Sequence, residues 1–173
     1  MELKTAMQYR ASCRAYKDQQ ISDAQLEAIL DAAYLAPVGM GSFENVQLVV
    51  LQDKDKLDQL NGLFQKAVGN PDAQPTYGAP TLIIVCEKKE MDDMISGSNA
   101  GCIIENMTLA ACAEGLGSVY LRGMFGAMED NEEANALFGT PEGYRAVSAA
   151  AVGIPAEEPV LREVVKNKMV TIR

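Results

Sequence analysis

The fold of this chain is decided by residues 99–114, NAGCIIENMTLAACAE, which predict a helix that is apolar nearly all round. Beyond Glu105, Asn106 and Glu114 it has almost no polar face. A helix with so narrow a polar face has to be covered on most of its sides. A small domain rarely covers one helix so completely by itself, so we expect part of this helix to lie at a subunit interface. Gly115 follows, where helices commonly end in a left-handed residue.

The segments around this helix alternate between helix and strand patterns. Ser22 is a candidate N-cap with Gln25 placed to complete a capping box, and the helix that follows must end near Pro37. Residues 81–86 are a continuous apolar run, as in a strand that is covered on both faces. Helices are further expected over residues 2–9, 53–67 and 129–138, and strands over residues 46–51, 118–121, 146–154 and 169–172. This alternation predicts an α+β or α/β layered fold, and the lack of any linker or repeat predicts a single domain over residues 1–173.

Composition and charge exclude several classes of function. The chain has 173 residues, 48% of them apolar, and its net charge of −9 argues against a nucleic-acid-binding protein. Histidine is absent, so neither a Ser-His-Asp triad, a Cys-His pair nor a histidine-ligated zinc site can form. No segment has the apolar pattern of a membrane span or a leader peptide, so we expect a cytoplasmic protein without a membrane partner.

The four cysteines are expected to be free thiols. Cys13, Cys86, Cys102 and Cys112 show no CxxC spacing. Cys86 falls in the apolar strand, and Cys102 and Cys112 fall in the apolar helix, so burial in the core is expected rather than disulfide bonding. Free thiols favour a reducing compartment, in agreement with the cytoplasm.

A second informative stretch is residues 9–15, YRASCRA. Arg10, Ser12 and Arg14 occupy alternate positions, which places them on one side of an extended segment. Two guanidiniums beside a hydroxyl group are well suited to bind a phosphate. On a chain of net negative charge they form a local positive site that would attract an anion. The alternative is a solvated basic turn after the first helix.

Five segments, in the same order along the chain, resemble motifs of the FMN-dependent nitroreductase family. Residues 10–16, RASCRAY, resemble the N-terminal Arg-x-Ser-x-Arg/Lys signature, and residues 35–41, LAPVGMG, resemble the Ala-Pro-Ser-Gly loop. Residues 78–85, GAPTLIIV, are similar to the strand that follows in the family. Residues 109–118, LAACAEGLGS, resemble the end of its central helix, and residues 151–157, AVGIPAE, resemble its Gly-x-Pro turn.

This resemblance runs from about residue 3 to residue 160 and implies a fold, a cofactor and a dimer. The fold would be α+β, a nitroreductase-like mixed sheet flanked by helices, in an intertwined homodimer with two FMN sites at the interface. Arg10, Ser12 and Arg14 would hold the ribityl and phosphate groups of FMN. The residues that would reach the flavin from the partner subunit are Val38, Gly39, Met40 and Gly41.

The resemblance also implies roles for two further regions. The backbone of Arg122 and Gly123 takes the place of the family's N–H groups near flavin N5, where a donor stabilises charge that develops on the ring. Arg162, Lys166 and Lys168 are candidates for a further basic contact to the phosphate. No side chain is assigned a catalytic proton transfer, and no metal is expected.

Simpler structural roles remain open for several of these residues. Gly39 and Gly41 are also typical of turns, Met40 also suits apolar packing, and Arg122 also suits a solvated surface position. The loop after Pro37 departs from the family pattern, because it lacks the usual serine and continues as GSFEN.

The implied activity is that of an NAD(P)H-dependent oxidoreductase that passes a hydride through FMN to a small acceptor, such as a nitro compound, a quinone or a flavin. The unusual loop after Pro37 keeps open a second class of function, a low-turnover FMN-binding redox sensor or flavin carrier. A third possibility, a dimer that has lost the flavin, is opposed by the presence of Arg10, Ser12 and Arg14.

Overall fold

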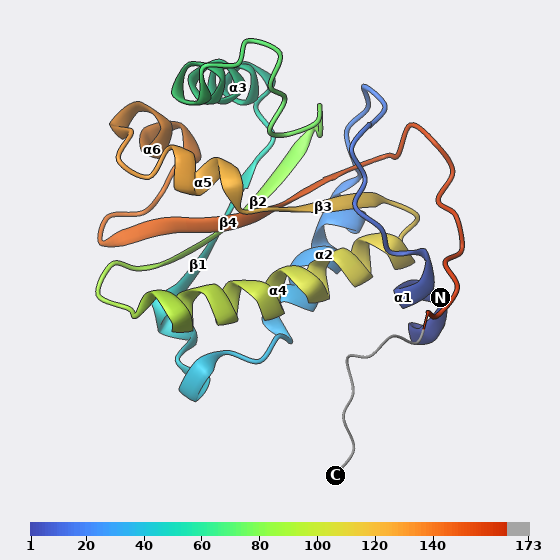
Figure 1. The fold of residues 1–173 in the computed structure, drawn as a ribbon. Coiled ribbons are helices and arrows are strands. Elements are labelled where there is room, and N and C mark those ends of the chain that lie inside the picture. Colours follow the sequence, from blue (N-terminus) through green and yellow to red (C-terminus); the bar gives the residue numbers. More distant parts are fainter. Residues whose placement is uncertain (166–173) are drawn as a thin grey trace.

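The apolar run at residues 81–86 lies in the middle of a four-stranded sheet. In the computed structural model, which describes residues 1–165, the strand order is β1-β2-β4-β3 and all three neighbouring pairs are antiparallel (Figure 1). The strands are β1 (Val46–Leu51), β2 (Thr81–Lys88), β3 (Gly117–Leu121) and β4 (Tyr144–Gly153). Within residues 1–165 the parallel component of the sheet is an isolated bridge between Ser12 and Ser118. The strand expected at residues 169–172, with Lys166 and Lys168, lies outside the described residues.

Side chains of β2 alternate between two apolar cores, which explains why its sequence is apolar without interruption. Leu82 and Ile84 belong to the core that also contains Phe138, whereas Ile83 and Val85 belong to the core that contains Ile104. All of these β2 side chains are fully buried. Burial of each one stabilises the fold by about 1.5–3 kcal/mol relative to exposure. The predicted double coverage of this strand is therefore confirmed.

Helices supply the outer layer on both faces of the sheet (Figure 1). One face is covered by α2 (Asp23–Tyr34) and α4 (Asp93–Ala113), and the other by α3 (Lys54–Val68), α5 (Gly123–Ala127) and α6 (Glu132–Phe138). The short helix α1 (Leu3–Tyr9) packs against α4. Two 3-10 turns, Gly39–Gly41 and Phe43–Asn45, connect α2 to β1. The predicted α+β layered architecture is confirmed.

Helix α4 is longer than the sequence pattern indicated. It begins at Asp93 rather than at residue 99, and the Asp92 carboxylate caps it by accepting hydrogen bonds from the N–H groups of Met94 and Ile95. The first turns carry serine and glycine, which are weak helix formers, so the cap and the packing beneath it decide the boundary. Within a single chain Met94 and Cys102 lie on an exposed side of this helix.

The region after β3 was predicted least well. Residues 123–127, GMFGA, form α5, a helix that the sequence analysis did not anticipate because its two glycines lower helix propensity. Burial of Met124 and Phe125 stabilises it in the fold. The helix expected from residue 129 begins at Glu132, where the Asn131 side chain caps it by accepting from the N–H of Ala134.

Other local predictions hold. Ser22 and Gln25 form a complete capping box at the start of α2, and Gly115 has the expected left-handed conformation after α4. Across the part of the chain that the structure describes, the helices are all too short or too polar to span a bilayer.

Candidate functional site

An extended segment after α1 carries Arg10, Ser12 and Arg14. The helix ends at Tyr9, and the chain then runs beside the start of β3, where the N–H of Cys13 donates to the carbonyl of Ser118 at 2.9 Å. Further on, the N–H of Lys17 donates to the carbonyl of Ile154 at 2.9 Å. The segment is therefore held along its length between β3 and the chain that leaves β4.

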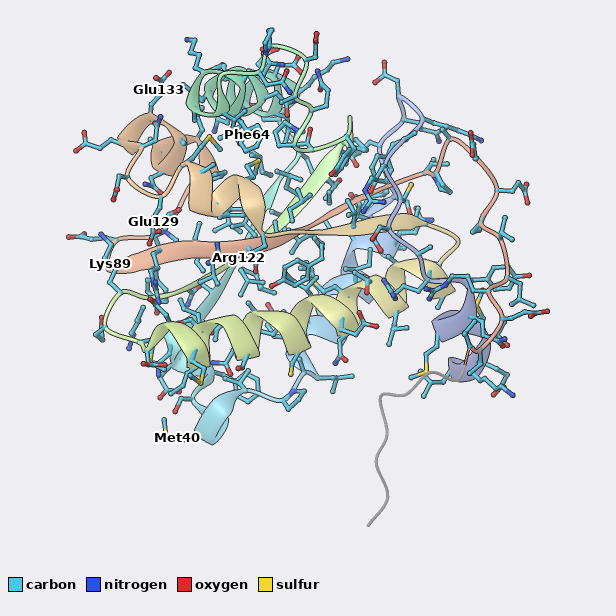
Figure 2. The ribbon with its side chains drawn as sticks, in the orientation of Figure 1. Met40, Phe64, Lys89, Arg122, Glu129 and Glu133 are labelled. Atoms are coloured by element: carbon cyan, nitrogen blue, oxygen red, sulfur yellow. The ribbon has the colours of Figure 1, made fainter. Side chains whose placement is uncertain are left out.

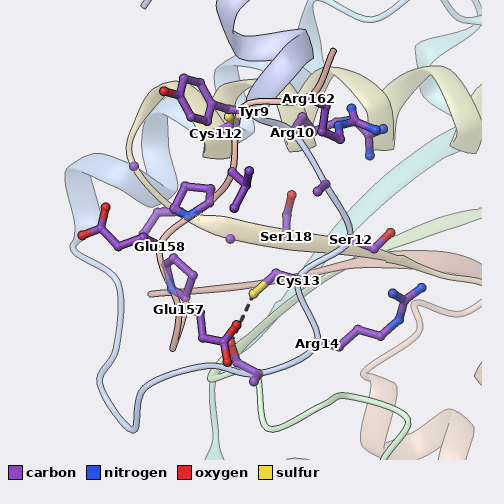
Figure 3. Close-up of a pocket in the computed structure, with 18 of the residues that line it drawn as sticks. Tyr9, Arg10, Ser12, Cys13, Arg14, Cys112, Ser118, Glu157, Glu158 and Arg162 are labelled. Atoms are coloured by element: carbon purple, nitrogen blue, oxygen red, sulfur yellow. Dashed lines mark hydrogen bonds between the residues drawn. The ribbon is translucent and has the colours of Figure 1, made fainter. Parts of the chain in front are cut away.

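The extended backbone places the three polar side chains on one side. Figure 3 shows Arg10, Ser12 and Arg14 pointing to the same side of the segment, whereas the thiol of Cys13 points to the other. This is the alternation expected of an extended chain, so the geometry predicted from the sequence is present. The Ser12 and Arg14 side chains are exposed, and the Arg10 side chain is 29% exposed.

Each arginine has a neighbouring side chain. Arg10 Nε lies 3.5 Å from Glu105 Oε1 on α4, and the Arg14 guanidinium carbon lies 5.8 Å from the centre of the Tyr77 ring. Tyr77 has a φ of 55°, an uncommon conformation for a residue other than glycine. Sequence reasoning missed Tyr77, because nothing in the Pro- and Gly-rich loop at residues 69–80 indicates that it returns to Arg14.

A cavity of about 840 Å³ adjoins the segment. It is bounded by residues 9–15, the end of α4 and residues 155–162. Arg162 lines it, but two of its guanidinium nitrogens are already used: Nε donates to the carbonyl of Gln8 at 3.2 Å and Nη2 to that of Met7 at 3.0 Å. Arg162 therefore closes the C-terminal end of α1, which a cation favours.

The thiols around this cavity are directed at main-chain carbonyls. Burial raises the pKa of Cys112, although Arg10 opposes the shift, and the Cys112 Sγ–H points to the carbonyl of Ala6 at 3.5 Å. The Cys13 thiol donates to the carbonyl of Ala15 at 3.2 Å. All four cysteines are free, as predicted, but the prediction that Cys102 lies in the core is wrong, because the helix period turns it to the exposed side of α4.

The turn of Val38, Gly39, Met40 and Gly41 lies away from the arginine segment. Figure 2 shows Met40 beyond the N-terminal half of α4, on the side away from β3 and Arg122. The N–H of Gly39 donates to Asn99 Oδ1 on α4 at 2.8 Å. Met40 has a φ of 57°, which costs a residue other than glycine about 1–2 kcal/mol, and it is 85% exposed. A single chain therefore does not bring this turn to Arg10, Ser12 and Arg14.

Arg122 and Gly123 lie at the far end of β3 from Ser12. At about 3.3 Å per residue, Arg122 is roughly 13 Å along the strand from Ser118, the bridge partner of Ser12. The Arg122 side chain turns toward Gly126 on α5 and lines a second cavity of about 110 Å³ with Arg145. Tyr120 stands between the two ends of β3, 40% exposed, with its hydroxyl 3.2 Å from Ser148 Oγ. The sequence analysis missed Tyr120. Its position between Val119 and Leu121, two apolar residues that are buried, could have indicated an aromatic side chain on the exposed face of the strand.

The arrangement suits an elongated ligand with a phosphate at one end. The Arg14 guanidinium and the Ser12 hydroxyl group are exposed at the start of β3, the Arg10 guanidinium is partly exposed beside them, and main-chain N–H groups follow the end of the strand. Close approach of the segment depends on Gly117, because a Cβ there would lie 2.6 Å from Cys13 Sγ. The residues present thus fit a phosphate-bearing cofactor that runs along β3.

Comparison with known proteins gives an independent indication of ancestry. The profile of the Nitroreductase family matches residues 7–154. A provisionally named NADH dehydrogenase/NAD(P)H nitroreductase from Archaeoglobus fulgidus is 32% identical over 154 residues, which are 86% of this chain and 83% of that protein. A provisionally named protein of the same description from Methanothermobacter thermautotrophicus is 28% identical over 170 residues, 94% of this chain and 82% of that protein.

Solved structures show the same fold. A nitroreductase with bound FMN from Bacteroides fragilis superposes with a TM-score of 0.87 at 31% identity and covers 100% of this chain and 99% of that one. One from Desulfitobacterium hafniense, also with bound FMN, has a TM-score of 0.86 at 23% identity, with 100% and 99% covered. Profile, relatives and fold agree over nearly the whole described chain, and the chain belongs to the nitroreductase family.

Proposed function

We propose that the protein is an FMN-dependent oxidoreductase that takes a hydride from NADH or NADPH and passes it to a small acceptor, such as a nitro compound, a quinone or a flavin. The observation that carries this proposal is the row of Arg10, Ser12 and Arg14, which point to one side of the segment that pairs with β3. Family membership and the FMN in the similar Bacteroides fragilis structure support the choice of cofactor.

In this proposal the protein binds and orients, and FMN supplies the hydride transfer chemistry when bound. Arg10 and Arg14 hold the phosphate with charge-assisted hydrogen bonds, and Ser12 adds a hydroxyl donor between them. The main-chain N–H groups at Arg122 and Gly123, which follow β3, would stabilise negative charge that develops on the ring. Since the chain has no histidine, the proton that accompanies reduction of the acceptor comes from water or another side chain.

A second copy of the chain completes the site. The turn at Val38, Gly39, Met40 and Gly41 cannot serve the arginine segment of its own chain, from which α4 separates it. Large apolar side chains around this turn are exposed in the single chain: Tyr34, Leu35, Met40, Phe43 and Met94. Exposed apolar groups gathered on adjoining elements are typical of a surface that another protein covers. We therefore infer a homodimer in which each turn lies at the flavin of the other subunit.

The test is the visible absorption spectrum of the purified protein after reconstitution with FMN, repeated after anaerobic addition of NADH and then NADPH. Bound flavin that bleaches within seconds supports an oxidoreductase and identifies its donor. Bound flavin that stays oxidised for many minutes supports the redox sensor or flavin carrier instead. A protein that binds no FMN contradicts both. The matched variant Arg10→Ala/Arg14→Ala should lose FMN, and retention of the flavin would contradict the phosphate-binding role.

A further inference from the structure

We propose that Asn99 is the positioning residue that presents the Val38–Gly41 turn to the flavin site of a second copy of this chain. The inference rests on the proposed function and adds a residue that neither the motifs nor the cavity lining identifies. Asn99 lies on α4, and its side chain touches neither Arg10 nor the cavity beside it. It acts through the turn that it holds.

The contact between Asn99 and Gly39 joins a buried side chain to an exposed turn. Asn99 is 5% exposed, and its Oδ1 accepts the Gly39 N–H at 2.8 Å. Ile95 lies one turn of α4 before Asn99 and also packs close to Gly39. A Cβ on Gly39 would lie 3.5 Å from Ile95 Cγ2 and 3.4 Å from Asn99 Oδ1. The turn is thus fixed to α4 at Gly39, directly before its exposed tip at Met40.

The turn is closed by its own backbone in a conformation that displays Met40. The N–H of Gly41 donates to the carbonyl of Val38 at 2.9 Å, and both Met40 and Gly41 have positive φ. Met40 is therefore unfavourable in two ways within a single chain: its left-handed backbone conformation is strained, and its apolar side chain is 85% exposed to water. That arrangement is understandable if a second molecule covers Met40, and the contact from Asn99 keeps the turn preformed before assembly.

The part of α4 that carries Asn99 is itself fixed to the sheet. Ser96 Oγ donates to the buried Glu87 Oε2 on β2 at 3.0 Å, and Arg145 Nη2 on β4 donates to Ser96 Oγ at 3.3 Å. Arg145 also pairs with Asp93 in the first turn of the helix. Asn99 lies about one helical turn beyond Ser96. Because this part of α4 is fixed to the sheet, the Asn99 side chain can hold the Val38–Gly41 turn in one position.

The first experiment is a titration of the apoprotein with FMN, with thermal unfolding of the same apoprotein as the structural readout. Asn99→Ala should weaken FMN binding about tenfold, the effect of losing one orienting hydrogen bond. The matched control is Asn106→Ala on the same helix, whose Nδ2 donates to the carbonyl of Ala32 at 3.1 Å. Both variants should lower the unfolding temperature of the apoprotein by a few degrees, because each loses one hydrogen bond. Asn106→Ala should nevertheless leave the Kd for FMN unchanged.

Two substitutions of similar shape identify the bond itself. Asn99→Leu keeps the approximate volume of the side chain and removes the acceptor of the Gly39 N–H, so it should weaken FMN binding as Asn99→Ala does. Asn99→Asp keeps an acceptor at the same place and should restore most of the affinity. An Asn99→Leu variant with the wild-type Kd, or an Asp variant no better than Ala, would overturn the inference.

Mixed dimers show whether the turn acts on the partner. One subunit carries Arg10→Ala/Arg14→Ala and the other carries Asn99→Ala, with separate tags for purification. If the turn serves the partner, one site is intact and one is doubly defective, so the dimer binds FMN at half the wild-type stoichiometry with the wild-type Kd. Two weakened sites, or a protein that is monomeric when FMN is bound, would overturn the inference. A wild-type chain that binds no FMN contradicts the proposed function, whereas wild-type binding with a normal Asn99→Ala variant contradicts the inference alone.

Discussion

The main-chain N–H of Cys13 lies 2.9 Å from the carbonyl oxygen of Ser118, and this hydrogen bond sets the direction of the proposed phosphate-binding side chains. It pairs the segment after α1 with the start of β3, so that Arg10, Ser12 and Arg14 point to one side and Cys13 to the other (Figure 3). The Cys13 side chain lies so close to Gly117 that a Cβ at that position would not fit. The site therefore depends on a glycine that binds nothing itself.

Gly117→Ala should lower both stability and flavin affinity. The new Cβ would lie 2.6 Å from Cys13 Sγ and 2.9 Å from Cys13 Cβ, so the segment must move away from β3. Overpacking of this kind lowers the free energy of unfolding by about 1–3 kcal/mol. Displacement of the two arginines should weaken FMN binding about tenfold. Thermal unfolding and an FMN titration measure the two effects.

The control for this change is Gly62→Ala in α3. A Cβ at Gly62 meets no atom within 4 Å, and alanine is the better helix former, so the fold should gain about 0.5–1 kcal/mol and the Kd for FMN should not move. If Gly117→Ala binds FMN as tightly as the wild type, the close pairing of Cys13 with Ser118 is not what orients the arginines.

Glu105→Gln should strengthen FMN binding. Glu105 Oε1 lies 3.5 Å from Arg10 Nε and competes with a phosphate for that guanidinium. The carboxylate is 55% exposed, so its removal is worth no more than about 0.2–1 kcal/mol, or up to about a fivefold lower Kd at low salt. Glu133→Gln on α6, far from the segment in Figure 2, should leave the Kd unchanged. A weaker Kd in Glu105→Gln would mean that the carboxylate positions Arg10 for the ligand.

Arg162→Ala should destabilise the fold without removing FMN. Its guanidinium donates to the carbonyls of Gln8 and Met7, so the loss of these bonds should cost about 1–2 kcal/mol at the end of α1. The Kd for FMN should change less than about threefold, because the phosphate is held by Arg10 and Arg14 in our proposal. A loss of affinity as large as that of Arg14→Ala would make Arg162 a phosphate ligand, as the family resemblance first suggested.

The parts of the fold that were predictable depend on short-range patterns. The capping box at Ser22, the doubly buried strand β2 and the left-handed Gly115 each follow from residues within one turn or one strand. The alternation of Arg10, Ser12 and Arg14 is of the same kind, since an extended backbone suffices to align them. In contrast, α5 contains two glycines and forms because Met124 and Phe125 are buried, which is a property of the surrounding core.

The parts of the site that were not predictable depend on contacts between distant segments. Tyr77 lies against Arg14 through a loop without a regular pattern, and Asn99 meets Gly39 across sixty positions of the chain. From the sequence alone, a polar residue such as Asn99 only interrupts the apolar pattern of the helix, and its hydrogen-bond partner cannot be inferred. Similarly, Arg162 has the chemistry of a phosphate ligand, and only the fold shows that its nitrogens are directed at α1.

The buried thiol of Cys86 should make the protein less stable at alkaline pH. Burial on β2 raises the pKa of Cys86 from 9.0 to about 12. Between these values the unfolded chain loses the proton and the folded chain keeps it, so ionisation stabilises the unfolded state. The contribution of Cys86 to the free energy of unfolding is therefore complete below pH 9 and is lost as the pH rises toward 12.

Cys86→Ala isolates this effect from the other groups that titrate in alkali. At pH 10.5, midway in the window, the wild type should have lost about 2 kcal/mol through Cys86, from 1.36 kcal/mol per pKa unit. Urea unfolding at pH 8 and pH 10.5 should show that the variant loses less stability over this interval by that amount, although alanine lowers its stability at both pH values. Cys102→Ala removes an exposed thiol and should follow the wild type. If Cys86→Ala and the wild type lose equal stability between pH 8 and pH 10.5, the thiol ionises in the folded protein as readily as in the unfolded chain, and β2 is less completely enclosed than the structure indicates.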